Sequence, residues 1–166
     1  MITKPIVFKS ESSFSDIRGT YFPLYSHSLS QKASIPSEID FVQDSICVNY
    51  SNVFRGFHGD NHTYKLISPV KGNFILYYFD YNSYISSSSI EVSCLAVSGE
   101  NNLSILLPPS YANAYLSLSH DSIYYYKQST EYGVHQQYTV PVSDSKLKIN
   151  LPLPIDQLIL SKRDSA

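Results

Sequence analysis

The sequence has little charge, few cysteines and no tryptophan. Charged residues make up 16% of its 166 residues, and the formal net charge is -2. This near-neutral balance argues against electrostatic capture of nucleic acid or of an anionic membrane. No apolar run approaches the length of a membrane span, and the first residues show neither a long apolar core nor a small-residue cleavage site. We therefore expect a cytoplasmic protein that binds neither nucleic acid nor a membrane.

Cysteine and metal-ligand patterns are equally scarce. Cys47 and Cys94 both lie in apolar alternating stretches, so we expect buried free thiols, and their spacing resembles no metal site. His62 follows His58 at a spacing that would suggest a metal on a helix. In a strand or turn this spacing does not place both histidines on one side of an ion. We predict no metal site.

Tyrosine and apolar residues are abundant and fall into short alternating segments. Hydrophobic residues make up 43% of the chain, which has 15 tyrosines. Alternation and turn signals predict strands at residues 19–26, 41–50, 51–58, 63–70, 73–81, 89–97, 103–109, 111–119, 122–130 and 136–142. The longest helix candidate is 36–40, and 83–91 is predicted to be an exposed loop. These features predict one all-β domain over residues 1–166, an antiparallel sandwich or jelly roll with a tail, 149–166, that packs back on it.

The segment "RGFHGDNHTYKL", residues 55–66, contains the most suggestive polar residues. An alternating strand places Gly56, His58 and Asp60 on one face and Arg55 on the other. If His58 points inward, it enters the mouth of the barrel, where Lys65 from the next strand could meet it. Taken alone, a histidine in a strand is more often structural or exposed than catalytic.

Six segments, in order along the chain, carry a family resemblance. They are "DIRGTYF" (16–22), "FVQDSICVNYSNVFRGFH" (41–58), "KLISPVKGNFILYYFD" (65–80), "LPPSYANAYLSLS" (107–119), "YYYKQSTEY" (124–132) and "LSKRD" (160–164). Together they resemble the nucleotide-sugar 3,5-epimerases typified by dTDP-4-dehydrorhamnose 3,5-epimerase. The resemblance implies a cupin-type jelly roll that forms a homodimer and needs no metal or cofactor.

The same resemblance implies the catalytic residues of an epimerase. His58 matches the family's base, Asp164 the carboxylate that pairs with it, Lys65 the lysine near the substrate carbonyl, and Tyr126 the tyrosine on the opposite face of the sugar. The C4 carbonyl of a nucleotide-linked 4-keto sugar acidifies the hydrogens on C3 and C5. A histidine can remove one of them near neutral pH, a cation can stabilise the enolate, and an acid across the ring can return a proton.

Four further residues are implied in substrate binding. Arg18, Gln43 and Arg55 match positions that hold the nucleotide diphosphate or support the pocket. Arginine suits a diphosphate because its fork binds paired oxygens. Asn113 stands where the family usually has a histidine, and an asparagine can donate to a carbonyl oxygen but cannot shuttle a proton.

Departures from the family pattern concern the nucleotide. Pro23 replaces an acid near the expected position of the nucleobase, and Gly59 with Asp60 replaces an aromatic residue and a glutamine. Gly59 and Asp60, together with "YKLI" (64–67), "NAY" (113–115) and "YYYKQST" (124–130), are more similar to the branch that acts on GDP-linked 4-keto heptoses in capsule synthesis. A GDP-linked substrate is therefore predicted.

Other interpretations remain open at this point. Tyr126 lies in a tyrosine-rich stretch and could serve only core packing, and Asp164 lies so near the chain end that fraying is the ordinary expectation. The chain could be a non-catalytic sugar-nucleotide binder on the same fold. It could also be a 4-keto-sugar 3,4-isomerase, although the histidine pair expected there is not evident.

Overall fold

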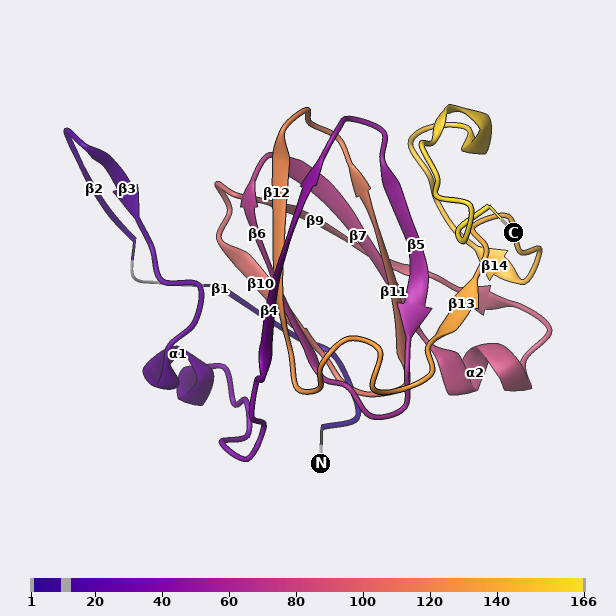
Figure 1. The fold of residues 1–166 in the computed structure, drawn as a ribbon, viewed down its shortest axis with the longest axis horizontal. Coiled ribbons are helices and arrows are strands. Elements are labelled where there is room, and N and C mark those ends of the chain that lie inside the picture. Colours follow the sequence, from indigo (N-terminus) through magenta and orange to yellow (C-terminus); the bar gives the residue numbers. More distant parts are fainter. Residues whose placement is uncertain (1, 10–12, 166) are drawn as a thin grey trace.

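Two five-stranded sheets face each other in the computed structural model, which describes residues 2–9 and 13–165 (Figure 1). The first sheet has the order β1 (Ile6–Lys9), β10 (Leu103–Leu107), β6 (Lys65–Lys71), β12 (Ser122–Gln128), β4 (Gln43–Asn49). The second has the order β13 (Tyr138–Val140), β5 (Phe54–Gly59), β11 (Tyr111–Ser117), β7 (Asn73–Asp80), β9 (Ser93–Ser98). Neighbouring strands within both sheets are antiparallel, and the predicted jelly roll is confirmed.

Alternating side chains give each sheet two different faces. In β7, Phe74 and Leu76 point between the sheets and pack with Ile67 and Tyr124 of the first sheet, while Tyr77 belongs to a separate cluster on the other face. The period of two residues along a strand accounts for this division. The inner cluster fills one end of the space between the sheets and leaves the other end free for polar residues.

The C-terminal tail covers the outer face of the second sheet. Phe54 and Phe57 pack there with Leu158 in one apolar cluster. The backbone of Ile159 accepts from the N–H of Phe54 at 3.1 Å and donates to the carbonyl of Asn52 at 2.9 Å. The strand β14 (Leu147–Lys148), which pairs with β8 (Ile90–Glu91), comes directly before this tail, and the tail contains the 3₁₀ turn η1 (Ile155–Gln157). In Figure 1 this yellow segment lies beside β13, as the predicted packing of the tail requires.

The helices do not lie where the sequence predicted one. Residues 36–40 form a turn, whereas α1 (His27–Lys32) and α2 (Tyr81–Ser86) each span 6 residues. Ser26 caps α1 by accepting from the N–H of Leu29, and Asp80 caps α2 by accepting from that of Asn82. The predicted loop over 83–91 was therefore wrong in its first part, because the cap at Asp80, before the serine-rich stretch, was overlooked. Cys94 is exposed and Cys47 half-buried, so the expected burial of both thiols was wrong too.

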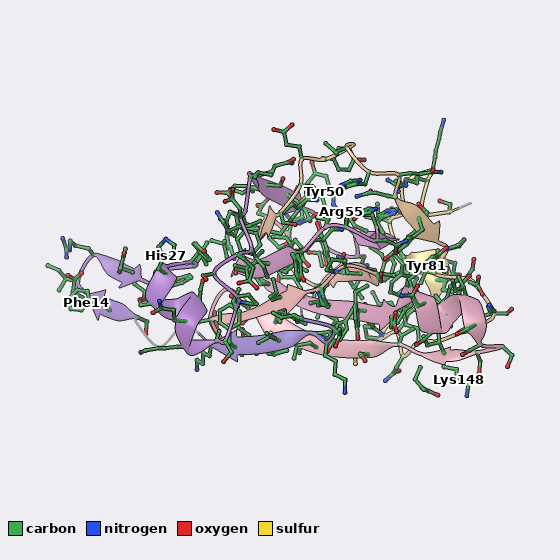
Figure 2. All side chains as sticks on the ribbon, turned by 90° about the horizontal axis from the view of Figure 1, so that it is seen from below. Phe14, His27, Tyr50, Arg55, Tyr81 and Lys148 are labelled. Atoms are coloured by element: carbon green, nitrogen blue, oxygen red, sulfur yellow. The ribbon has the colours of Figure 1, made fainter. Side chains whose placement is uncertain are left out.

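A hairpin near the N-terminus stands away from the two sheets. It consists of β2 (Phe14–Asp16) and β3 (Gly19–Tyr21), and its residues Phe14, Ile17 and Tyr21 are exposed. Figure 2 shows Phe14 at the end of the molecule opposite Tyr81 and Lys148. Within the part of the chain that the structure describes, no helix is long and apolar enough to cross a bilayer.

Candidate active site

A cavity of about 530 Å³ opens between the two sheets at the end left free by the apolar core. Its walls come from both sheets and from the C-terminal tail. The residues predicted for the site that line it are Arg55, His58, Lys65, Asn113, Tyr126 and Asp164. Strands far apart in the sequence therefore bring these side chains together, and the volume falls within the range usual for small-molecule sites.

His58 lies in β5 with both ring nitrogens close to polar partners. Its Nε2 is 2.7 Å from Oδ1 of Asp164, and its Nδ1 is 3.2 Å from Oγ1 of Thr139, the residue opposite it in β13. An ionised carboxylate can only accept, so Nε2 carries the hydrogen and Nδ1 the lone pair. Arg163 donates to the same Thr139 oxygen at 2.9 Å, which leaves the threonine hydrogen free for Nδ1.

Asp164 is buried although it lies close to the chain end. Ser161 donates to its Oδ2 at 2.8 Å. Burial raises the pKa of the Asp164 carboxyl, but hydrogen bonds from His58, Ser161 and the N–H of Gly56 outweigh it and bring the pKa below its ordinary value. A negative charge is thus held beside His58, where it can stabilise an imidazolium ion.

The C-terminal tail can bring Asp164 this close to β5 only because residue 56 is a glycine. A Cβ on Gly56 would lie 2.6 Å from Oδ1 of Asp164 and 2.9 Å from its Cγ. Any larger side chain at this position would occupy the space of the carboxylate. The glycine before His58 is therefore a condition for the contact between His58 and Asp164.

Because β5 contains a bulge, its side chains are divided between the two faces of the sheet differently from the prediction. Asn113 of β11 lies opposite His58, and Tyr115 lies opposite Arg55, so β5 has one residue more than β11 over this stretch. Arg55 and His58 consequently line the same cavity, and the prediction that they lie on opposite faces was wrong. Asp60 was also misplaced: it lies beyond the end of β5, where it accepts from the backbone N–H of the following turn.

Lys65 begins β6 and points into the cavity. Its Nζ donates to Oδ1 of Asn113 at 3.2 Å. Burial lowers the pKa of this lysine to about 8; Asp60 partly opposes the shift, and Arg163 adds to it. Because Oδ1 of Asn113 already accepts from Lys65, its amide hydrogens are available to a second group.

Tyr126 lines the cavity from β12, on the opposite wall from His58. Burial raises the pKa of its phenol above the ordinary value. The hydroxyl therefore keeps its hydrogen at neutral pH and can act as a proton donor. The two walls thus present a base and an acid to whatever occupies the space between them.

The three residues expected to bind a diphosphate have different positions. Arg55 lines the cavity, and its Nε donates to Oδ1 of Asn49 at 3.0 Å. Gln43 lies at the start of β4, next to Tyr132, and is not part of the lining. Arg18 is on the projecting hairpin, where it pairs with Asp16 at 2.6 Å, away from the cavity of its own chain.

Sequence reasoning missed several polar or aromatic residues that line the cavity or adjoin it, and four of them are the most relevant to its chemistry. They are Gln128, Tyr132, Thr139 and Arg163. Oε1 of Gln128 is buried without a hydrogen-bond partner among the described residues. Arg163 was signalled by its place next to Asp164, whereas Thr139 could be found only from the pairing of β13 with β5.

Within residues 2–9 and 13–165, no group of three or more histidine, cysteine, aspartate or glutamate side chains is arranged so that it could hold a metal ion. His62 does not turn towards His58. Its ring stacks on that of His135 with the centroids 4.2 Å apart. The cavity therefore offers the chemistry of histidine, lysine, tyrosine and a carboxylate.

Comparisons with known proteins agree with this geometry. Residues 2–166 match the family described as dTDP-4-dehydrorhamnose 3,5-epimerase. The chain is 27% identical to the dTDP-4-dehydrorhamnose 3,5-epimerase of Methanothermobacter thermautotrophicus, over 91% of this chain and 82% of that one. A relative of the same name from Shigella flexneri is also 27% identical, over 91% and 83% of the two chains.

Solved structures show the same fold. The dTDP-4-dehydrorhamnose 3,5-epimerase of Elizabethkingia anophelis superposes with a TM-score of 0.79 at 25% identity, covering 98% of this chain and 88% of that one. An epimerase from Legionella pneumophila, solved in complex with dTDP-4-keto-L-rhamnose, gives a TM-score of 0.80 at 21% identity, with coverage of 97% and 90%.

Proposed function

The chain belongs to the dTDP-4-dehydrorhamnose 3,5-epimerase family and is thus an epimerase of nucleotide-linked 4-keto sugars; we propose that His58 is its base and Tyr126 its acid. The observation that supports this assignment is the contact between His58 and the buried Asp164 in one cavity with Lys65 and Tyr126. A base and an acid on opposite walls are what inversion of a carbon between them requires.

In the proposed reaction the Thr139 hydroxyl turns away from Nδ1 of His58 when the sugar binds. Nδ1, which carries the lone pair, then removes the hydrogen from C3 or C5, and His58 becomes an imidazolium ion. Asp164 stabilises that ion and holds the tautomer in which Nε2 carries hydrogen. The electrons move to the C4 oxygen, where the ammonium of Lys65 and the amide of Asn113 stabilise the enolate. Tyr126 then returns a proton to the other face, which inverts the centre.

We propose that the nucleotide is dTDP. The Legionella relative was solved with dTDP-4-keto-L-rhamnose, and a 3'-monoepimerase from Streptomyces bikiniensis with dTDP-quinovose. The prediction of a GDP-linked heptose rested partly on Gly59 and Asp60, which have structural roles here. A Cβ on Gly59 would clash with the carbonyl oxygen of Tyr111, and Asp60 accepts from the backbone of the next turn.

Calorimetry with dTDP and with GDP tests the choice of nucleotide. We expect tighter binding of dTDP. Tighter binding of GDP would support the sequence prediction of a GDP-linked substrate, which rests also on Pro23 and on the segments 64–67, 113–115 and 124–130. A role in capsule or other surface polysaccharide synthesis and a cytoplasmic location stay predictions from the sequence.

The assignment of the base is tested with His58→Asn. We expect turnover to fall by about 10²–10⁴-fold, the usual contribution of a positioned base, with the fold intact. The measurement is NMR in deuterated water, which follows both exchange and inversion at C3 and C5. If the wild-type protein neither exchanges nor inverts, it is a binder without activity; migration of the carbonyl to C3 would identify a 3,4-isomerase.

A further inference from the structure

A hydrogen bond between Asn49 and Arg55 joins the two sheets beside the cavity. Asn49 ends β4 in the first sheet, and Arg55 lies near the start of β5 in the second. Nε of Arg55 donates to Oδ1 of Asn49 at 3.0 Å. Asn49 is only 3% exposed, whereas Arg55 is exposed and lines the cavity. A buried amide, which was not among the residues predicted for the site, thus holds one side of an exposed guanidinium.

The orientation of the Asn49 amide is fixed by its other partners. The hydroxyl of Tyr115 donates to the same Oδ1 at 3.0 Å, and Nδ2 donates to the carbonyl oxygen of Cys47 at 3.1 Å. A backbone carbonyl can only accept and Nε of an arginine can only donate, so the two ends of the amide cannot be exchanged. Tyr115 in turn stacks on Tyr124 with the ring centroids 3.9 Å apart. The oxygen that meets Arg55 therefore has a defined position.

Asn49 holds Arg55 without compensating its positive charge. The amide oxygen is neutral, and among the residues that the structure describes Nε is the one nitrogen of Arg55 with a hydrogen-bond partner. Because Nε is occupied, the two terminal nitrogens form the fork that remains for an anion, and such a fork suits paired phosphate oxygens. We propose that Asn49 is a positioning residue that presents the terminal nitrogens of Arg55 to the diphosphate of the nucleotide.

This role of Asn49 rests on the proposed function, because that function supplies the diphosphate. The diphosphate is common to dTDP and GDP, so the role does not depend on the nucleobase. Asn49 acts through Arg55 and not on the sugar. Its removal should therefore weaken the binding of nucleotide and leave the turnover of bound sugar, which depends on His58 and Tyr126, unchanged.

The test is a double-mutant cycle of Asn49→Ala and Arg55→Ala, with the affinities for dTDP and for GDP measured by calorimetry. Asn49→Ala should weaken the better-bound nucleotide by about tenfold, since the lost hydrogen bond involves a charged group. In the Arg55→Ala background the same substitution should have no further effect, because the group it positions is gone. The kcat of Asn49→Ala, measured by NMR with dTDP-4-keto-L-rhamnose, should stay within about twofold of wild type.

Asn49→Asp tests the same role in a variant that keeps the hydrogen bonds to Oδ1. An aspartate can still accept from Arg55 and from Tyr115, so the contact between the sheets is retained. Its carboxylate compensates the charge of the guanidinium, however. We expect the affinity for nucleotide to fall at least as much as in Asn49→Ala.

Asn101→Ala is the matched control. Oδ1 of Asn101 also accepts two hydrogen bonds, from the N–H groups of Ser98 and Leu103 at 3.1 Å each, in a turn outside the lining of the cavity. This variant loses a comparable set of asparagine hydrogen bonds and should bind nucleotide as wild type does.

Three results would overturn the positioning role of Asn49. They are wild-type affinity in Asn49→Ala or Asn49→Asp, an equal loss of affinity in Asn101→Ala, and a further loss when Asn49→Ala is added to Arg55→Ala. A wild-type protein that binds nucleotide but neither exchanges nor inverts the sugar would overturn the proposed function and leave this role standing. A wild-type protein that binds neither nucleotide would overturn both.

Discussion

Burial lowers the pKa of Lys65, and this lowered pKa sets a pH range for the reaction. Its pKa is lowered to about 8, so the ammonium proposed to stabilise the enolate is lost as pH rises through that value. We therefore expect kcat/KM to fall above about pH 8. Lys65→Arg keeps a positive charge at these pH values and should remove the fall, even if the rate is lower.

The pH–rate profiles of wild type, Lys65→Arg and Lys71→Arg test this prediction. Lys71 ends the same strand, is exposed and does not line the cavity, so its variant should keep the wild-type profile. An alkaline fall that persists in Lys65→Arg would assign it to another group. The folding stability depends on pH in the opposite direction from the rate. Between about pH 8 and the ordinary lysine value of 10.5, Lys65 is protonated in the unfolded chain but not in the folded one. The contribution of Lys65 to the free energy of unfolding therefore rises with pH over this range.

A second prediction about a single residue concerns Gly56. In Gly56→Ala the new methyl group would meet the carboxylate of Asp164, so either the tail or β5 must move. We expect a loss of about 1–3 kcal/mol in the free energy of unfolding and a loss of turnover as severe as that in Asp164→Asn. Chemical denaturation and steady-state rates measure the two effects.

The double variant Gly56→Ala with Asp164→Ala separates packing from chemistry. Removal of the carboxylate relieves the closest contacts, so stability should recover relative to Gly56→Ala, whereas turnover should not. Wild-type turnover in Gly56→Ala alone would show that the contact between His58 and Asp164 is dispensable.

Among the elements, the C-terminal tail has the clearest role in the site. Its backbone bonds to β5 through Ile159, and it ends with Asp164 beside His58. Deleting the residues from Ser161 onwards should therefore leave the sheets folded and reduce turnover at least as much as Asp164→Asn does. Circular dichroism and the exchange assay would show this. Full activity of the shortened chain would refute a docked tail.

The elements also show what the sequence could and could not predict. Strands such as β7 and β12 were predictable because their alternation is a local property, and each predicted strand range does contain a strand. The bulge in β5 was not, because it depends on the register with β11, which the sequence of β5 does not contain. Thr139 was missed for the same reason. The family resemblance supplied His58 and Asp164 as a pair, which residue spacing alone could not.

At the scale of the whole molecule, two apolar surfaces lack a partner within the described chain. β4 is an edge strand whose outward residues Ile46 and Val48 are each 63% exposed, and the projecting hairpin exposes Ile17 completely. Monomeric proteins rarely expose contiguous apolar surface of this kind. The homodimer that the family resemblance implies would cover both surfaces if it formed through them.

We expect sedimentation at micromolar concentration to show a dimer. Ile46→Lys should shift the protein towards monomer, because it places a charge on the β4 surface. Ile85→Lys, on α2, is the control, since Ile85 is similarly exposed, at 59%, but lies on neither surface. A wild-type protein that sediments only as monomer would contradict the prediction.

Arg18 connects the dimer to the reaction. It does not line the cavity of its own chain, so a role in binding the diphosphate requires the hairpin to reach the partner's site.

Mixed dimers test this arrangement. The homodimers of Arg18→Ala and of His58→Asn should then both have low activity, the first because it binds substrate poorly and the second because it lacks the base. Mixing the two subunits should restore activity, because one site of the mixed dimer combines an intact His58 with the intact Arg18 of the other subunit. If Arg18 serves its own chain, each site of the mixed dimer carries one defect and no activity returns. Rates measured on mixed and unmixed proteins at equal total concentration distinguish the two arrangements.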